Sequence, residues 1–105
     1  MNRGIWDILV NSYENNPRDV ITRPQNRQGI WFYVYVENKC IFIESARDHT
    51  NSSAIKGRRR LEYDKADVML ALYYDRKTGK PVGKEAAAIT HNQVYWYGIF
   101  SDLQL

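Results

Sequence analysis

The most strongly patterned segment of the chain is residues 29–44, GIWFYVYVENKCIFIE. Every residue from Ile30 to Val36 is an aliphatic or aromatic type that favours β-strands. Glu37 and Asn38 interrupt the run as a two-residue turn, because asparagine tolerates a positive φ. Residues 39–44 then return as a second strand. The segment therefore predicts a β-hairpin.

The position of the turn sets the register of this hairpin. With the predicted turn, Val34 lies opposite Ile41 and Tyr35 lies opposite Cys40. One face then carries a mainly aliphatic set: Ile30, Phe32, Val34, Val36, Ile41 and Ile43. The other face carries an aromatic set: Trp31, Tyr33, Tyr35 and Phe42. A slip of one residue would mix the two sets, which supports the assignment of faces.

A helix is predicted before the hairpin, over residues 3–14. Its apolar side chains recur on one face: Ile5, Trp6, Leu9, Val10 and Tyr13. Asn2 is the expected N-cap, and Pro17 follows the end of the helix. Residues 17–28 form a polar connector in which residues 20–22 allow a short extended piece.

Two segments after the hairpin can be interpreted as helix or strand. Residues 65–77 are predicted to be a helix because Asp64 suits the N-cap and Gly79 follows the end, with a strand as the alternative. Residues 84–103 favour one continuous amphipathic helix. The alternatives are a strand over residues 94–100 and a separate second helix capped by Thr90.

Together these elements predict an α+β fold. We expect a small antiparallel sheet built on the 30–44 hairpin, an N-terminal helix and one or two C-terminal helices that cover the aliphatic face. The length of 105 residues suits one domain, residues 1–105. The composition, with 44% hydrophobic and 26% charged residues, is that of a globular protein.

The sequence also limits the compartment and the chemistry. The longest apolar run is too short to span a membrane, and the first residues do not form a signal-peptide core, so we expect a cytoplasmic protein with no membrane partner. Cys40 is the only cysteine, which excludes an internal disulfide. With two histidines in separate halves of the chain, we expect no metal site and no cofactor.

The net charge of +3 arises in the second half of the chain. From Lys56 to Lys84 there are nine basic residues against four acidic ones. Arginine pairs with phosphate oxygens, so the cluster predicts a surface for a nucleic acid or an acidic protein. Its candidate residues are Lys56, Arg58, Arg59, Arg60, Lys80 and Lys84. The simpler interpretation is a solvated charged face.

Residues 84–100 have the outline of a helix-turn-helix motif. The first residues of its second helix would face base edges, and the candidates are His91, Asn92, Gln93 and Tyr95. The usual glycine of the turn is missing, so the continuous helix remains the favoured interpretation.

The aromatic face of the hairpin is the second candidate surface, formed by Trp31, Tyr33, Tyr35 and Phe42. Such rings can stack on single-stranded bases. The RNA-binding modules that do so carry four strands and Gly-aromatic motifs, and the sequence predicts neither. A homodimer interface or an intramolecular cover is therefore preferred for this face.

No enzyme is indicated. Asp48 and His49 have Ser52 and Ser53 nearby, but catalytic triads are built from separated elements. The leading hypothesis is a non-enzymatic binding domain for a nucleic acid or another anionic partner. The alternative is a protein-interaction or homo-oligomerisation module that uses the aromatic face, and a small-molecule pocket between sheet and helix is a third option.

Overall fold

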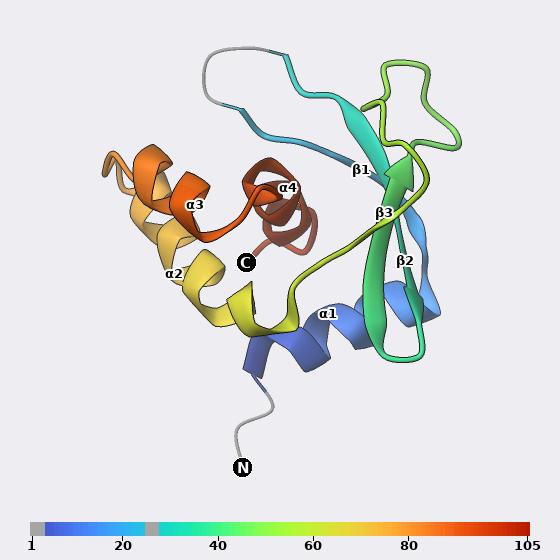
Figure 1. The fold of residues 1–105 in the computed structure, drawn as a ribbon, viewed down its shortest axis with the longest axis horizontal. Coiled ribbons are helices and arrows are strands. Elements are labelled where there is room, and N and C mark those ends of the chain that lie inside the picture. The colour runs from blue at the N-terminus through green and yellow to red at the C-terminus, as the bar shows by residue number, and fades with distance from the viewer. Residues whose placement is uncertain (1–3, 25–27) are drawn as a thin grey trace.

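A four-stranded sheet packs against a layer of helices in the computed structural model, which describes residues 4–24 and 28–105 (Figure 1). In chain order the elements are α1 (Gly4–Asn15), β1 (Arg18–Ile21), β2 (Trp31–Glu37), β3 (Cys40–Ser45), β4 (Arg59–Arg60), the 3-10 turn η1 (Tyr63–Lys65), α2 (Ala66–Lys77), α3 (Gly83–Ile89) and α4 (Gln93–Asp102). The predicted α+β fold is confirmed. The expected N-cap Asn2 lies outside the described residues.

The sheet is an antiparallel meander with the strand order β1-β2-β3-β4. The extended piece expected at residues 20–22 is β1, which pairs with β2. The sequence did not predict four strands. The fourth strand, β4, is only two residues long and pairs with Phe42 and Ile43 of β3.

The predicted register of the hairpin is wrong by two residues. Val34 pairs with Ile43 and Tyr35 with Phe42, because the turn lies at Asn38 and Lys39 rather than at residues 37 and 38. Both turn residues have a positive φ, 53° and 64°. Two left-handed residues give the turn the twist that joins antiparallel strands well, and Lys39 takes the place usually held by glycine. The shift is even, so both predicted faces survive.

The hydrophobic core lies between the aliphatic face of the sheet, hereafter the inner face, and α4. Phe32, Val34 and Ile43 are fully buried against this helix layer. Gly98 lets α4 approach the sheet closely, since a Cβ there would lie 2.8 Å from the carbonyl oxygen of Ile21 and 3.2 Å from the Phe32 ring. The helix axis can therefore sit nearer the strands than a larger residue would allow.

α1 and α2 complete the core. The five residues predicted for the apolar face of α1 are all buried. The helical interpretation of residues 65–77 is confirmed and the strand is wrong, but the predicted cap is also wrong. The N-cap position belongs to Lys65 and has no side-chain cap, because the 3-10 turn η1 leads the chain into α2. Gly79 follows α2 with a φ of 91°, as its position predicted.

The favoured continuous helix over residues 84–103 is wrong, and so is the strand over residues 94–100. Two helices, α3 and α4, are separated at Thr90, whose backbone is extended. The Thr90 hydroxyl donates to Glu62 (2.6 Å) and accepts from the backbone amide of Asn92 (3.0 Å). Burial raises the pKa of Glu62, but the hydrogen bonds from Thr90 and Asn92 outweigh this and hold it below its ordinary value. This anionic carboxylate from a distant part of the chain stabilises the break.

Candidate binding surface on the outer face of the sheet

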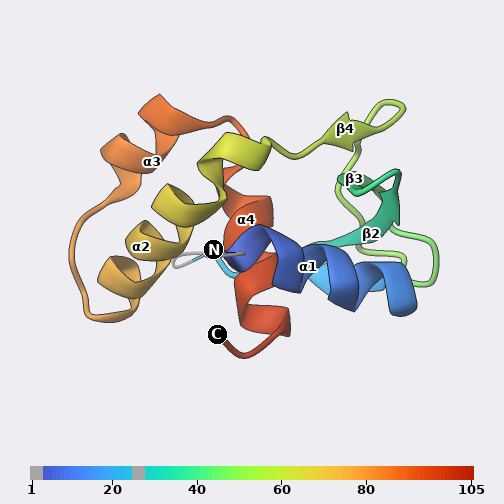
Figure 2. The same cartoon turned by 90° about the horizontal axis from the view of Figure 1, so that it is seen from below.

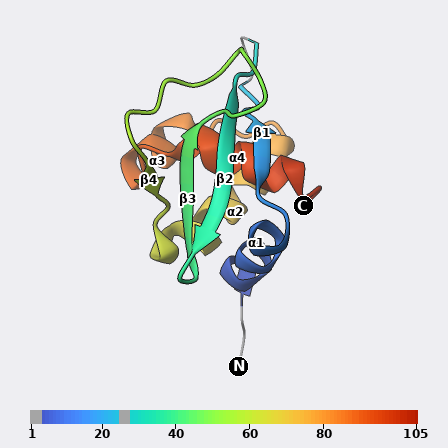
Figure 3. The same cartoon turned by 90° about the vertical axis from the view of Figure 1, so that its right-hand side faces the viewer.

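The outer face of the sheet, opposite the helices, carries the aromatic side chains. Figure 3 looks onto this face, with the strands in front of the helical layer. Trp31, Tyr33 and Tyr35 come from β2 and Phe42 from β3, as the alternation predicted. Phe42 is only 9% exposed, and the three β2 rings are partly buried. Among the described residues, their cover comes from side chains and not from a helix or strand.

Two guanidinium groups and one imidazole lie over these rings. The Arg47 guanidinium is 4.0 Å from the centre of the Tyr33 ring, and that of Arg58 is 3.9 Å from the centre of the Phe42 ring. The His49 ring stacks on Trp31 with a centroid separation of 3.5 Å and an angle of 8°. Such contacts combine the attraction of a cation for a ring with the burial of apolar area. The covering residues come from the chain that joins β3 to β4.

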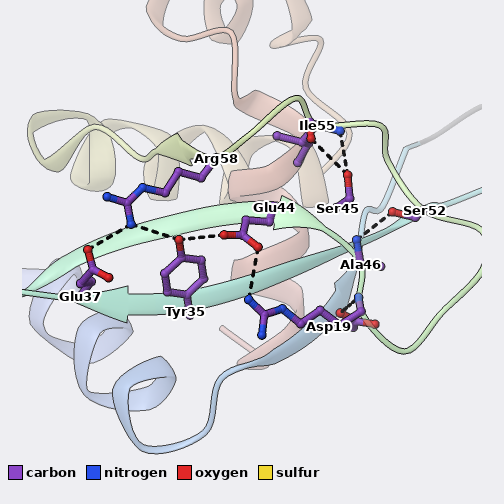
Figure 4. A network of polar contacts seen from close by, with 10 residues as sticks. Asp19, Tyr35, Glu37, Glu44, Ser45, Ala46, Ser52, Ile55 and Arg58 are labelled. Carbon is purple, nitrogen blue, oxygen red and sulfur yellow. Dashed lines mark hydrogen bonds and ion pairs between the residues drawn. The ribbon is translucent and has the colours of Figure 1, made fainter.

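A hydrogen-bonded chain connects the polar tips of this face (Figure 4). The Tyr35 hydroxyl donates to Glu44 Oε2 (2.9 Å) and accepts from Arg58 Nη1 (3.2 Å). Arg58 also donates to Glu37 Oε1 (3.0 Å), and Arg47 donates to Glu44 Oε1 (3.3 Å). Burial, together with Glu44, raises the pKa of Tyr35 although Arg58 lowers it, so the hydroxyl stays protonated. The surface thus carries balanced charges around neutral rings.

Asp19 anchors the loop that supplies the covering cations. Its side chain is 2% exposed and accepts from the backbone amides of Arg47 (2.9 Å) and Asp48 (2.7 Å) and from the ring of His49 (2.8 Å). Burial raises the pKa of Asp19, but these hydrogen bonds outweigh it and hold the pKa below its ordinary value. A buried anion with three donors fixes the position of residues 47–49 over the rings.

Sequence reasoning missed this arrangement. His49 bonds to Asp19 on β1, a residue that the sequence did not single out, and not to its neighbour Asp48. Neither nearby serine makes a hydrogen bond to His49 within the described residues: Ser52 bonds to the backbone of Ala46 and Ser53, and the Ser53 hydroxyl bonds to Tyr95. One feature of the sequence could have indicated it. Aromatic rings on a sheet face without a helix over it are favourable partners for cationic side chains from an adjacent loop.

The structure divides the predicted basic cluster at β4. Arg60 lies opposite Phe42, and Arg58, which precedes β4, lies over the same ring, so both share the outer face. Arg59 points to the other side, where its Nη1 donates to Asn92 Oδ1 (3.3 Å). All three arginines are exposed. Two of them therefore belong to the candidate surface and the third does not.

The other predicted cations do not all join this surface. Lys56 is exposed in the loop before β4. Lys80 lies after α2 and Lys84 within α3, and Figure 2 shows β4 and α3 on opposite sides of the molecule. The charge excess of the second half of the sequence is therefore spread over two regions.

The residues predicted to read bases from α4 are largely used within the protein. Tyr95 is buried beside Phe32, and its hydroxyl lies 2.6 Å from that of Ser53. The buried Asn92 amide is held between Glu62 and Arg59. Gln93 is half-buried, and only His91 is exposed. Asn92 and Tyr95 therefore serve the interior of the protein and do not form a surface for bases.

Comparison of the chain with protein-family models, curated proteins and solved structures found no match. Residues 4–24 and 28–105 contain no helix that is both long and apolar enough to cross a membrane. In the same part of the chain, no three His, Cys, Asp or Glu side chains are grouped as metal ligands would be.

Proposed function

We propose that this protein is a binding domain for single-stranded nucleic acid and that the outer face of its sheet is the binding surface. The observation that supports this most is that Arg47 lies over Tyr33, Arg58 lies over Phe42 and His49 stacks on Trp31. Bases stack on aromatic rings and on guanidinium planes, largely without regard to sequence. The face thus offers several planar groups side by side on a sheet.

The charges on this face can be redirected to phosphate. The pairs Arg47–Glu44 and Arg58–Glu37 are solvent-exposed on the arginine side, and such pairs contribute only about 0–1 kcal/mol. A phosphate oxygen can therefore replace a glutamate at small cost. Arg60 is exposed on the same face and makes no ion pair with the described residues, so its charge is available to a polyanion.

A homodimer through the same face is the second candidate. Its supporting observation is that two arginine–glutamate ion pairs, Arg47–Glu44 and Arg58–Glu37, lie beside the rings. In a two-fold interface the same patch meets itself, and an arginine of one copy can meet a glutamate of the other. Such a dimer would bury the rings and would not need a polyanion.

The test is binding of a labelled single-stranded oligonucleotide, followed by fluorescence anisotropy at two salt concentrations. We expect binding that weakens severalfold or more between about 50 and about 200 mM salt, because phosphate contacts release counterions. Replacing both Arg58 and Arg60 by glutamine should weaken binding and flatten the salt dependence. The control is Lys84→Gln, an exposed cation on α3, which should leave binding nearly unchanged.

The salt dependence of binding and the oligomeric state together separate the two candidates. No affinity at low salt, or affinity that does not depend on salt, would overturn the nucleic-acid proposal. A dimer that persists at high salt in light scattering, and that the double variant Tyr33→Ser, Tyr35→Ser converts to monomer, would instead support the homodimer. A dimer unaffected by that variant would count against this face as the interface.

A further inference from the structure

A pocket among the helices is separate from the outer face and has the properties of a small-molecule site. It has a volume of about 540 Å³ and opens between the residues that follow β1, the end of α2 and the beginnings of α3 and α4. Pockets of about 300–1,000 Å³ are typical of sites for small ligands. None of the residues argued above for the outer face lines it.

The charged lining of this pocket is positive. Arg23, Arg76 and Lys80 contribute to its wall, and no acidic residue among those described does. Lys80 makes an exposed ion pair with Asp75 at 3.5 Å, outside the lining. The Arg76 guanidinium lies over the Tyr97 ring at 4.7 Å and donates one hydrogen bond to the carbonyl oxygen of Arg23. Its other N–H groups have no partner within the described residues. The pocket therefore favours an anionic group.

Two polar atoms of the lining residues are buried without a partner. The Tyr97 hydroxyl and the Gln93 amide oxygen make no hydrogen bond within residues 4–24 and 28–105. Tyr97 is only 6% exposed. Two other tyrosines buried as deeply are satisfied, since Tyr13 donates to Asp102 and Tyr95 bonds to Ser53. A buried polar group without a partner is unfavourable, and it commonly marks a missing ligand or water.

The protonation state of Tyr97 supports a donor role. Burial raises the pKa of its hydroxyl above the ordinary value, and the nearby Arg76 lowers it by less. The hydroxyl is therefore neutral and can donate a hydrogen bond to an anion. The amide oxygen of Gln93 can only accept, so it suits a hydroxyl or amine.

The remaining lining is apolar. Pro24, Pro81, Val82 and Val94 form the part of the wall without charge. An inorganic ion would leave these surfaces in contact with water, whereas a ligand with a carbon body would cover them. The lining thus combines an anionic subsite with an apolar one.

We propose that this pocket binds a small organic anion, with its phosphate or carboxylate group against Arg76 and Lys80. Tyr97 donates a hydrogen bond to the same group, and Gln93 accepts one from a hydroxyl or amine of the ligand. The apolar body of the ligand lies against the proline and valine side chains. The site is independent of the proposed function, because its residues and its ligand are different.

The first experiment titrates the full chain with four compounds and follows backbone amide signals by NMR. The compounds are phenyl phosphate, benzoate, inorganic phosphate and benzyl alcohol. We expect at least one of the two aromatic anions to shift the signals of residues 76–83 and 93–97, and the one that binds more tightly identifies the charged group. The affinity for benzyl alcohol should be lower by about tenfold or more, because this compound lacks the charge.

Three outcomes would overturn the proposal. The first is the absence of any signal shift with either aromatic anion up to about 10 mM. The affinity would then be too weak for a preformed binding site. The second is equal binding of benzyl alcohol, which would show that the cations do not select the ligand. The third is equal binding of inorganic phosphate and phenyl phosphate, which would show that the apolar wall contributes nothing.

The second experiment uses variants whose folding is independently checked. Arg76→Gln should weaken the binding of the preferred anion about tenfold or more, and Tyr97→Phe about tenfold, because each removes a hydrogen bond to a charged group. Tyr97→Phe should leave the melting temperature of the free protein unchanged or higher, since its hydroxyl has no partner among the described residues. The matched control Lys84→Gln should change neither.

Tyr97 gives the sharpest decision between ligand binding and structure. If Tyr97→Phe lowers the melting temperature and leaves the affinity unchanged, the hydroxyl has a structural role and the proposal fails.

Competition distinguishes this site from the outer face. A single-stranded oligonucleotide that binds the outer face should not displace phenyl phosphate, and either binding event can fail without the other.

Discussion

The two faces of the sheet are made by the same strands, yet their surroundings differ. On the inner face, Phe32 and Val34 are fully buried against helices. On the outer face, Tyr33 and Tyr35 alternate with them along β2, and they contact neighbouring rings and the charged side chains of Arg47 and Arg58 instead of helices. The inner cover is part of the core and cannot be exchanged. The outer cover consists of exposed arginines and His49, whose contacts a partner could take over, and this supports the proposal that the outer face binds a partner.

The strongest way to test this contrast is to truncate neighbouring rings on opposite faces. Phe32→Ala should destabilise the protein by about 3–5 kcal/mol, because it opens a cavity in a core where the ring is fully buried. Tyr33→Ala, one residue along the same strand, is the matched control and should cost much less. Urea denaturation of both variants measures the difference. Equal losses would mean that the outer rings are as structural as the inner ones.

A smaller loss is expected where α4 approaches the inner face. Gly98→Ala should destabilise the protein by about 1–3 kcal/mol, because the added Cβ would lie 2.8 Å from the Ile21 carbonyl oxygen. Alanine has a higher helix propensity than glycine, so the helix alone would gain stability. Thermal denaturation decides the sign, and a rise in melting temperature would show that α4 can move away from the sheet without loss.

The role of Asp19, which anchors residues 47–49 over the rings, can be tested through the pH dependence of the stability of the protein. Because the pKa of Asp19 is lowered in the folded protein, its carboxylate stabilises the fold above the unfolded pKa of about 3.9, and this stability is lost as the pH falls through the folded pKa. Asp19→Asn should cost about 1–2 kcal/mol at neutral pH and should reduce the loss of stability in acid.

The control for Asp19 is its neighbour in space, Asp48, whose side chain is exposed. Asp48→Asn should leave both the stability and its pH dependence nearly unchanged. Glu62 also has a lowered pKa, so some acid dependence should remain in Asp19→Asn. An acid profile identical to that of the natural chain would contradict the role assigned to Asp19.

The smallest expected effect concerns the outer cover itself. Arg47→Ala removes a guanidinium that lies over Tyr33 and pairs with Glu44, and it should cost less than about 1 kcal/mol because the group is exposed. Chemical denaturation should show this small change, while the accessibility of Tyr33 to solvent quenchers increases. A loss above about 2 kcal/mol would show that the cover is structural and not exchangeable.

The sequence predicted which residues share a face but not how the strands align. Alternation along residues 30–44 assigns each side chain to a face, and a shift of two residues leaves that assignment intact. The register depended on Lys39 adopting a positive φ, for which its residue type gives no signal. The break at Thr90 depended on Glu62, which is distant in the sequence. Local patterns cannot report such partners.

The candidate surfaces were predictable to different degrees. The aromatic face followed from the period of a strand. The role of Asp19 did not, because its three donors come from a loop about thirty residues away. The sequence suggests that Gln93 contacts base edges, whereas the structure buries its amide oxygen at the wall of a pocket. The role of Asp19 and the position of Gln93 both depend on chain segments that only folding brings together.

The brevity of the outermost strands has a consequence for how the protein behaves when concentrated. β4 has two residues, both arginine, and β1 has four, beginning with Arg18. An extended chain can add to a sheet only along a border with enough free backbone groups, and like charges discourage an identical chain from doing so. These two borders are therefore poor templates for fibril growth.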